Sequence, residues 1–137
     1  MAKQKDRVII DTNLWINFLL TSDYSKLDNI LLKKELTLLF SQDLLSEFIE
    51  VCQRPKFKKY FSANDVQILL TKIAQHATFI EVESDVNICR DFKDNFLLAL
   101  AKDGKATHLI TGDKDILELI KFGKTKIITM TAYLSEQ

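Results

Sequence analysis

Two acidic residues, far apart in the chain, each close a run of apolar residues. Asp11 comes directly after Val8–Ile10, and Asp113 ends the run Thr107–Asp113. Each run predicts a short buried strand, and parallel strands place their carboxyl ends at one edge of a sheet, where ligands bind. Two carboxylates that meet there repel each other, and a divalent cation such as Mg²⁺ removes that repulsion. The alternative is that Asp11 only ends its strand or caps the following helix.

Asp94 is a third candidate for this edge. It begins a segment that is apolar nearly all round, which predicts a buried helix. Asp94 is therefore either the N-cap of that helix or a site residue, and the two roles are compatible because the helix dipole favours a charged carboxylate. Its neighbour Asp91 is ambiguous. Asp115, in the first turn of another predicted helix, is better explained as a cap or dipole partner than as a ligand.

Glu47 is the fourth candidate. At about 100° per residue, its helix gathers an apolar stripe on one side, made of Leu44, Leu45, Phe48 and Cys52. Glu47 borders that stripe, whereas Glu50 falls nearly opposite it. A glutamate beside a buried face can reach a cleft, although it can also reach solvent. We therefore expect Glu47, and not Glu50, at the site.

The segments that would position these acids alternate between strand and helix patterns. Strands are predicted at 8–10, 36–40, 79–82, 107–110 and 126–129, and helices at 14–19, 25–35, 41–52, 62–73, 94–101 and 114–121. This alternation predicts an α/β fold with three layers, α/β/α, and a central parallel sheet. The weakly marked segment Phe79–Val82 leaves an α+β domain with some antiparallel strand as the alternative.

Local signals mark several helix ends. Asn13 is placed to cap the first helix, and Ser62 with Asp65 has the spacing of a capping box. Gly104 is expected to end the buried helix, and Gly123 to stop the helix that starts at Lys114.

Composition limits the class of protein. The 137 residues, 47% apolar and 28% charged, fit a single soluble domain over 1–137. No apolar run approaches the roughly 20 residues of a membrane span, and residues 1–6 lack the apolar region of a signal peptide. The two cysteines form no metal-binding or redox pair, so we expect them to be reduced, in a cytoplasmic protein.

Nucleic acid binding would need a local basic surface, because 19 basic side chains balance 19 acidic ones. One cluster has basic residues interleaved with aromatic residues, and its charged members are Arg54, Lys56, Lys58 and Lys59. Such a cluster could contact phosphates and bases. A solvated loop explains it equally well.

Four short motifs, taken in order, resemble the PIN domain family. They are Val8–Asn13, Leu45–Phe48, Asp94–Ala101 and Thr111–Asp115, and together they span almost the whole chain. The stretch Arg54–Phe57 resembles the VapC-like branch, the ribonuclease toxins of toxin–antitoxin pairs.

The resemblance implies a metal-dependent ribonuclease with Mg²⁺ or Mn²⁺ in an acidic pocket. It maps the acidic residues of the family onto Asp11, Glu47, Asp94 and Asp113 and gives Asn13 or Thr111 a supporting role through hydrogen bonds. An RNA substrate, an antitoxin that blocks the pocket and a homodimer are the partners that it implies. Asn95 stands where relatives often carry a further acid, which leaves one or two metal ions open.

Two other functions fit the same fold. A phosphoryl-transfer domain of the phosphatase or receiver kind also uses an aspartate after a strand. The acid expected two residues after a phosphatase nucleophile is replaced here by Asn13. A non-catalytic module that binds a partner is the second alternative, and the four intact carboxylates argue against it.

Overall fold

The computed structural model describes residues 5–33, 36–87 and 94–136. In these ranges a six-stranded sheet has the order β3-β2-β1-β4-β6-β5. The strands are β1 (Asp6–Ile10), β2 (Leu36–Phe40), β3 (Ala77–Phe79), β4 (His108–Ile110), β5 (Lys121–Phe122) and β6 (Thr125–Ile128). The helices are α1 (Thr12–Thr21), α2 (Ser25–Lys33), α3 (Gln42–Cys52), α4 (Pro55–Lys58), α5 (Ala63–Ala74), α6 (Asn95–Asp103), α7 (Lys114–Leu117) and α8 (Met130–Ser135).

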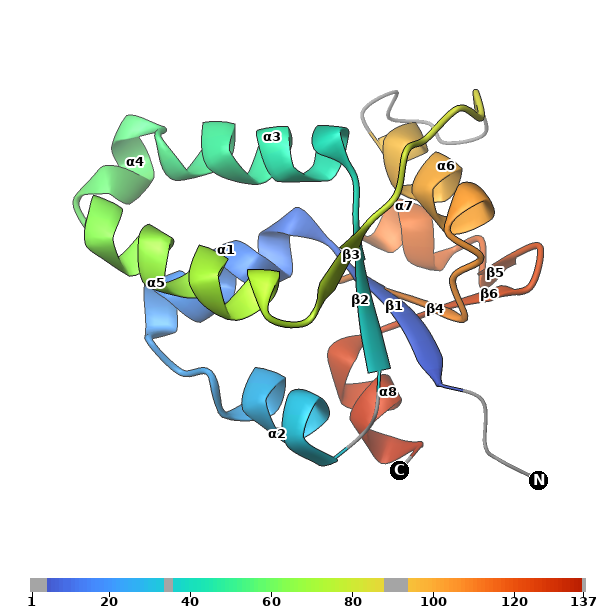
Figure 1. The fold of residues 1–137 in the computed structure, drawn as a ribbon, viewed down its shortest axis with the longest axis horizontal. Helices are drawn as coiled ribbons and strands as arrows, with labels where there is room; N and C mark the ends of the chain where they lie inside the picture. The colour runs from blue at the N-terminus through green and yellow to red at the C-terminus, as the bar shows by residue number, and fades with distance from the viewer. Residues whose placement is uncertain (1–4, 34–35, 88–93, 137) are drawn as a thin grey trace.

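The sheet lies between two groups of helices (Figure 1). α1, α3 and α5 lie on one side of it and α6 and α7 on the other. All strand pairs are parallel except β5 with β6. The predicted three-layer α/β/α fold with a central parallel sheet is confirmed; the sheet is mostly parallel, with its antiparallel pair confined to one edge.

β1 occupies the middle of the sheet, and its register aligns the strand ends. Ile10 pairs with Ile110 on one side, and Val8 pairs with Leu38 on the other. The hydrogen-bond ladder continues past the strands, because Asp11 N donates to Ile110 O at 2.9 Å and Thr111 N donates to Ile128 O at 3.0 Å. The residues that follow β1 and β4 therefore lie side by side.

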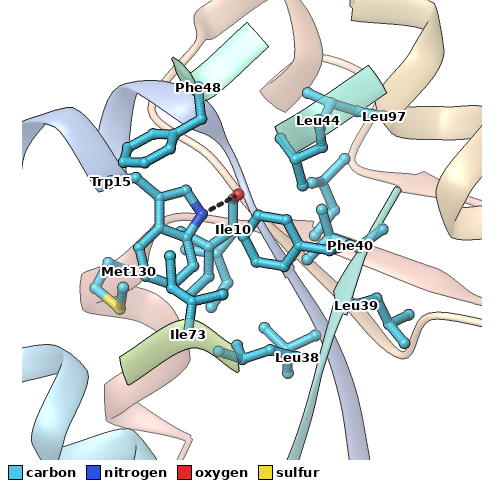
Figure 2. Close-up of a cluster of buried hydrophobic side chains, with 14 of the residues drawn as sticks. Ile10, Trp15, Leu38, Leu39, Phe40, Leu44, Phe48, Ile73, Leu97 and Met130 are labelled. Carbon is cyan, nitrogen blue, oxygen red and sulfur yellow. Dashed lines mark hydrogen bonds between the residues drawn. The ribbon is translucent and has the colours of Figure 1, made fainter. Parts of the chain in front are cut away.

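Trp15 fixes α1 on the end of β1. Its indole nitrogen donates to the carbonyl oxygen of Ile10 at 2.9 Å, and its ring lies 5.7 Å from that of Phe40, measured between centroids. Phe48 and Ile73 pack around the same fully buried ring (Figure 2). Because a buried carbonyl without a partner is costly, this bond holds the start of α1 at the carboxyl edge of the sheet.

The start of α1 differs from the prediction. The helix begins at Thr12, Asp11 takes the N-cap position without a side-chain cap bond, and Asn13 lies exposed in the first turn. The prediction that Asn13 caps this helix is wrong, because the helix starts as soon as β1 ends.

The region after Asp113 contains the largest error of the sequence prediction. The helix expected over 114–121 ends at Leu117, and Lys121–Phe122 form β5 instead. Ile120 takes a left-handed φ of 63°, which reverses the chain, and Gly123, with φ of 58°, sits at the first central position of the two-residue turn between β5 and β6. Gly123 thus makes a hairpin and does not stop a helix.

Two other strands are displaced along the chain. β3 ends at Phe79 because it is held in register with β2, whose last residue Phe40 pairs with Phe79, so the strand expected over 79–82 begins two residues earlier, at Ala77. β6 ends at Ile128 because Thr129 caps α8 and accepts a hydrogen bond from Ala132 N at 3.1 Å.

Two predicted helix starts are confirmed. Ser41 caps α3 through a bond from Leu44 N at 3.2 Å. Ser62 and Asp65 form both halves of the capping box at α5. Within the part of the chain that is described, no helix has both the length and the apolar character needed to cross a membrane.

α6 ends at Gly104, but for a different reason from the expected one. Gly104 has an ordinary φ of −84°, and the left-handed residue is Lys105, with φ of 53°. A Cβ at position 104 would lie 2.9 Å from Leu100 O and 3.0 Å from Cδ1 of Leu39. Glycine is needed here for the close approach of α6 to β2.

This difference makes a paired prediction. Gly104→Ala should lower the free energy of unfolding by about 1–3 kcal/mol because the methyl group meets a backbone oxygen. Lys105→Gly should leave stability unchanged or raise it by up to about 1 kcal/mol, since glycine relieves the left-handed strain. Urea unfolding of both variants checks this. A stable Gly104→Ala protein would show that α6 can shift away from β2.

Candidate active site

Asp11 lies at the carboxyl end of β1 and is only 6% exposed. Its Oδ2 accepts a hydrogen bond from Oγ1 of Thr111 at 2.7 Å. Burial raises the pKa of this carboxyl, and the nearby charges of Glu47 and Asp113 raise it further, whereas the Thr111 hydroxyl and the backbone N–H of Thr12 act in the opposite direction. Asp11 is therefore a buried acid with two acidic neighbours.

Thr111 connects Asp11 to Asp113. Its hydroxyl donates to Asp11 and accepts from the backbone N–H of Asp113 at 3.0 Å. Asp113 in turn caps α7, because its Oδ1 accepts from Asp115 N at 2.8 Å. These two bonds are the geometric basis for the supporting role expected of Thr111.

Glu47 lies half-buried on α3, and its Oε2 accepts from Oγ1 of Thr12 at 2.6 Å. Glu50 is exposed on the outer side of the same helix, where it pairs with Arg54 at 3.0 Å. The helix is therefore rotated as its apolar stripe predicts. Thr12 was missed by the sequence analysis, and its place directly after Asp11 at a helix start was the only available signal.

Asp94 immediately precedes α6, and its Oδ2 is buried. Its backbone is helical (φ −80°, ψ −15°), and among the described residues its side chain makes no cap bond to the helix. A side-chain cap therefore does not explain Asp94. The N-termini of α1, α3 and α6 gather above the carboxyl edge of the sheet (Figure 1), so Asp94 is at the same end of the molecule as Asp11.

The other predicted supporting residues are Asn13, Asp115 and Asp91. Asn13 is exposed, and no described contact connects it to the carboxylates. Asp115 is also exposed, in the first turn of α7. Asp91 lies outside the described residues.

A cleft of about 430 Å³ opens beside Glu47. Asp43 of α3, Asp85 of the extended segment after β3, and Asn95 and Phe96 of α6 also line it. The cleft is thus acidic and lies between the starts of α3 and α6. It provides room for a ligand next to Glu47.

The basic cluster lies at the far end of α3 from the sheet edge (Figure 1). Lys56 Nζ lies 5.0 Å from the ring centre of Phe57, and Lys59 Nζ lies 5.2 Å from that of Tyr60, which is 62% exposed. The cluster therefore presents exposed cations and an aromatic ring together.

The donors at the sheet edge fit a hard divalent cation in their chemistry. Asp11, Glu47 and Asp113 offer carboxylate oxygens, and no described basic residue forms an ion pair with them. Across residues 5–33, 36–87 and 94–136, no three acidic, histidine or cysteine side chains converge closely enough to form a metal site. Hydroxyl groups of Thr12 and Thr111 hold two of the carboxylates instead. A bound cation would stabilise the charged form of Asp11 and so lower its raised pKa.

Three comparisons place the chain among known proteins. Residues 7–115 match the PIN domain. An uncharacterized protein of Methanocaldococcus jannaschii, MJ1680, is 32% identical over 122 residues, which are 87% of this chain and 78% of the relative. The crystal structure of VapBC2 from Rickettsia felis, bound to a DNA fragment from their promoter, shares the fold. Its TM-score is 0.60 at 16% identity, over 88% of this chain and 96% of that one.

The raised pKa of Asp11 predicts how stability depends on pH. The folded state holds the Asp11 proton more tightly than the unfolded state, whose carboxyl has a pKa near 3.8, so Asp11 lowers stability as the pH rises through its folded-state pKa. In EDTA at pH 7, Asp11→Asn should therefore raise Tm.

The difference in Tm between Asp11→Asn and wild type should shrink as the pH is lowered, because Asp11 then becomes neutral in both the folded and the unfolded state. Thermal melts across the acid range provide the measurement. A variant less stable than wild type at pH 7, with no dependence on pH, would show that the Asp11 charge is well compensated in the native state.

Proposed function

The chain belongs to the PIN domain family, and on that premise we propose that it is a metal-dependent ribonuclease, the toxin of a toxin–antitoxin pair. The observation that carries the proposal is the buried carboxyl of Asp11 at the carboxyl edge of the sheet, connected to Asp113 through the hydroxyl of Thr111. Glu47 and Asp113 lie close enough for their charges to raise the pKa of Asp11. A buried carboxyl with a raised pKa is typical of active sites, and Glu47 lines a cleft.

Asp11, Asp94 and Asp113 would hold Mg²⁺ or Mn²⁺, with Glu47 as the fourth acid of the site. The ion would lower the pKa of a water and stabilise charge on the scissile phosphate. The protein would orient the carboxylates through Thr111 and exclude water from Asp11 by burial. One carboxylate would accept the proton of the attacking water. Support for this assignment comes from the oxygen-only donor set.

RNA and an antitoxin are the proposed partners. The VapBC2 structure from Rickettsia felis shares this fold, which is consistent with a chain that acts as one half of such a pair. From the family resemblance we also propose that the chain forms a homodimer. The basic cluster of Arg54, Lys56, Lys58 and Lys59 would bind RNA phosphates away from the carboxylates.

Phosphoryl transfer through Asp11 is less well supported. The residue two positions later, Asn13, is exposed and not acidic. A phosphate mimic that trapped a covalent adduct on Asp11 would favour that function. A non-catalytic module would bind its partner but give no cleavage in the test below.

The decisive test is RNA cleavage with Mn²⁺ or Mg²⁺ and with EDTA. We expect cleavage that requires the metal, and a rise in Tm when the metal binds the native state. Glu47→Gln should lower the cleavage rate and the metal affinity by about 10-fold or more, and so reduce the rise in Tm, because Glu47 faces the site. Glu50→Gln is the matched control on the same helix, and its exposed ion pair with Arg54 is worth at most about 1 kcal/mol.

Equal losses in the two glutamate variants would mean that the effect is on folding. A loss in Glu50→Gln alone would mean that the wrong glutamate has been assigned. Cleavage that persists in EDTA would contradict the metal mechanism.

RNA affinity tests the basic cluster separately. In EDTA, the double variant Lys56→Gln/Lys59→Gln should bind single-stranded RNA more weakly, and the slope of log K against log salt should fall in magnitude by about 1.4, since each neutralised phosphate contributes about 0.7. Fluorescence anisotropy over a salt series provides the measurement. Lys26→Gln/Lys124→Gln removes two exposed lysines elsewhere and should leave the slope unchanged. Identical slopes in the wild type and both double variants would exclude the basic cluster as an RNA-binding surface.

A further inference from the structure

We propose that Thr12 is a positioning residue that holds the carboxylate of Glu47 at the metal-binding edge of the sheet. This inference rests on the proposed function, because it assigns Thr12 a part in the same site. Thr12 does not contact the metal or the RNA in this proposal. It acts through Glu47.

The hydrogen bond between the two side chains carries the inference. Oγ1 of Thr12 lies 2.6 Å from Oε2 of Glu47. Hydroxyl groups that donate to an ionised carboxylate give short, strong bonds of this length. Thr12 is only 3% exposed, so its hydroxyl has little access to water. The Thr12 hydroxyl is therefore committed to Glu47.

Thr12 is itself rigidly placed. It is the first residue of α1, directly after Asp11, and α1 is fixed to β1 by the bond from Trp15 to Ile10 O. The backbone N–H of Thr12 favours the charged form of Asp11, while its hydroxyl binds Glu47. One residue thus contacts Asp11, directly after β1, and Glu47 of α3, and sets their relative position.

Glu47 needs such a constraint more than the aspartates do. A glutamate side chain has an additional rotatable bond, and ordering a long polar side chain costs up to about 2 kcal/mol of conformational entropy. Glu47 is half-buried and close enough to Asp11 to be repelled by it. Without the hydroxyl, its carboxylate would turn toward solvent. The bond uses Oε2 and leaves Oε1 for a cation or a water molecule.

The same device occurs a second time at this edge. Thr111 donates to Oδ2 of Asp11 at 2.7 Å, as Thr12 donates to Oε2 of Glu47. Hydrogen-bond partners of metal-binding carboxylates commonly raise metal affinity by 10- to 100-fold. A purely structural bond between α1 and α3 would instead stabilise the fold and leave metal affinity unchanged.

The test is a Mn²⁺ titration of Thr12→Val and Thr12→Ser, in which binding is measured by calorimetry and by the rise in Tm. Valine keeps the shape of threonine without the hydroxyl, and we expect Mn²⁺ to bind about 10-fold more weakly. Serine restores the hydroxyl and should bind within about 3-fold of wild type. RNA affinity in EDTA should be the same in all variants.

Thr125→Val is the matched control. Thr125 is equally buried, and its hydroxyl donates to the carbonyl oxygen of Ala106 at 2.7 Å, away from any of the proposed site residues. This variant should lose stability in EDTA without any loss of Mn²⁺ affinity. The control thus separates the loss of a buried hydroxyl from the loss of a bond to Glu47.

A double-mutant cycle completes the experiment. If Thr12 acts through Glu47, Thr12→Val should have no further effect on Mn²⁺ affinity in the Glu47→Gln background. Independent losses, or unchanged affinity in Thr12→Val, would overturn the inference while wild-type cleavage leaves the proposed function intact. A wild-type protein that neither binds Mn²⁺ nor cleaves RNA would overturn the proposed function, and the inference with it, before any variant is made.

Discussion

The position of β1 between β2 and β4 is the constraint on which the rest of the structure depends. Its register with β4 pairs Ile10 with Ile110, so the next residues, Asp11 and Thr111, meet across a separation of 100 residues in the chain. A slip of one residue would turn these side chains to opposite faces of the sheet. The buried apolar side chains of the two strands prevent that slip. Hydrophobic packing thus determines where the polar site is assembled.

Burial of Asp11 works against folding, and the surroundings only partly offset it. Its pKa is raised although Thr111 and Thr12 both donate toward it, which means that desolvation and the charges of Glu47 and Asp113 prevail. Such strain is expected where function, not stability, selects the residues. The buried apolar side chains packed around Trp15 (Figure 2) and the parallel hydrogen-bond ladder of the sheet stabilise the fold and offset this cost.

Sequence patterns predicted what local physics determines. The capping box of Ser62 follows from spacing within one turn, and the orientation of Glu47 follows from the apolar stripe of α3. The errors lie where distant contacts decide. The helix predicted over 114–121 stops at Leu117, and Lys121–Phe122 form β5 because β6 offers a partner. Gly104 is needed because β2 passes close to α6. The bond from Thr12 to Glu47 could not be predicted because the two residues are 35 positions apart in the chain.

The use of threonine hydroxyls, in place of lysine or arginine, is consistent with a site meant for a cation. A basic side chain would neutralise a buried carboxylate and compete with any metal for it. A hydroxyl is a neutral donor. It holds one carboxylate oxygen in place and leaves the negative charge of the carboxylate to be balanced by a bound ligand. In the described ranges, Asp11 and Glu47 have hydroxyl donors and no ion pair with a basic side chain. This negative charge is what the proposed divalent ion would balance.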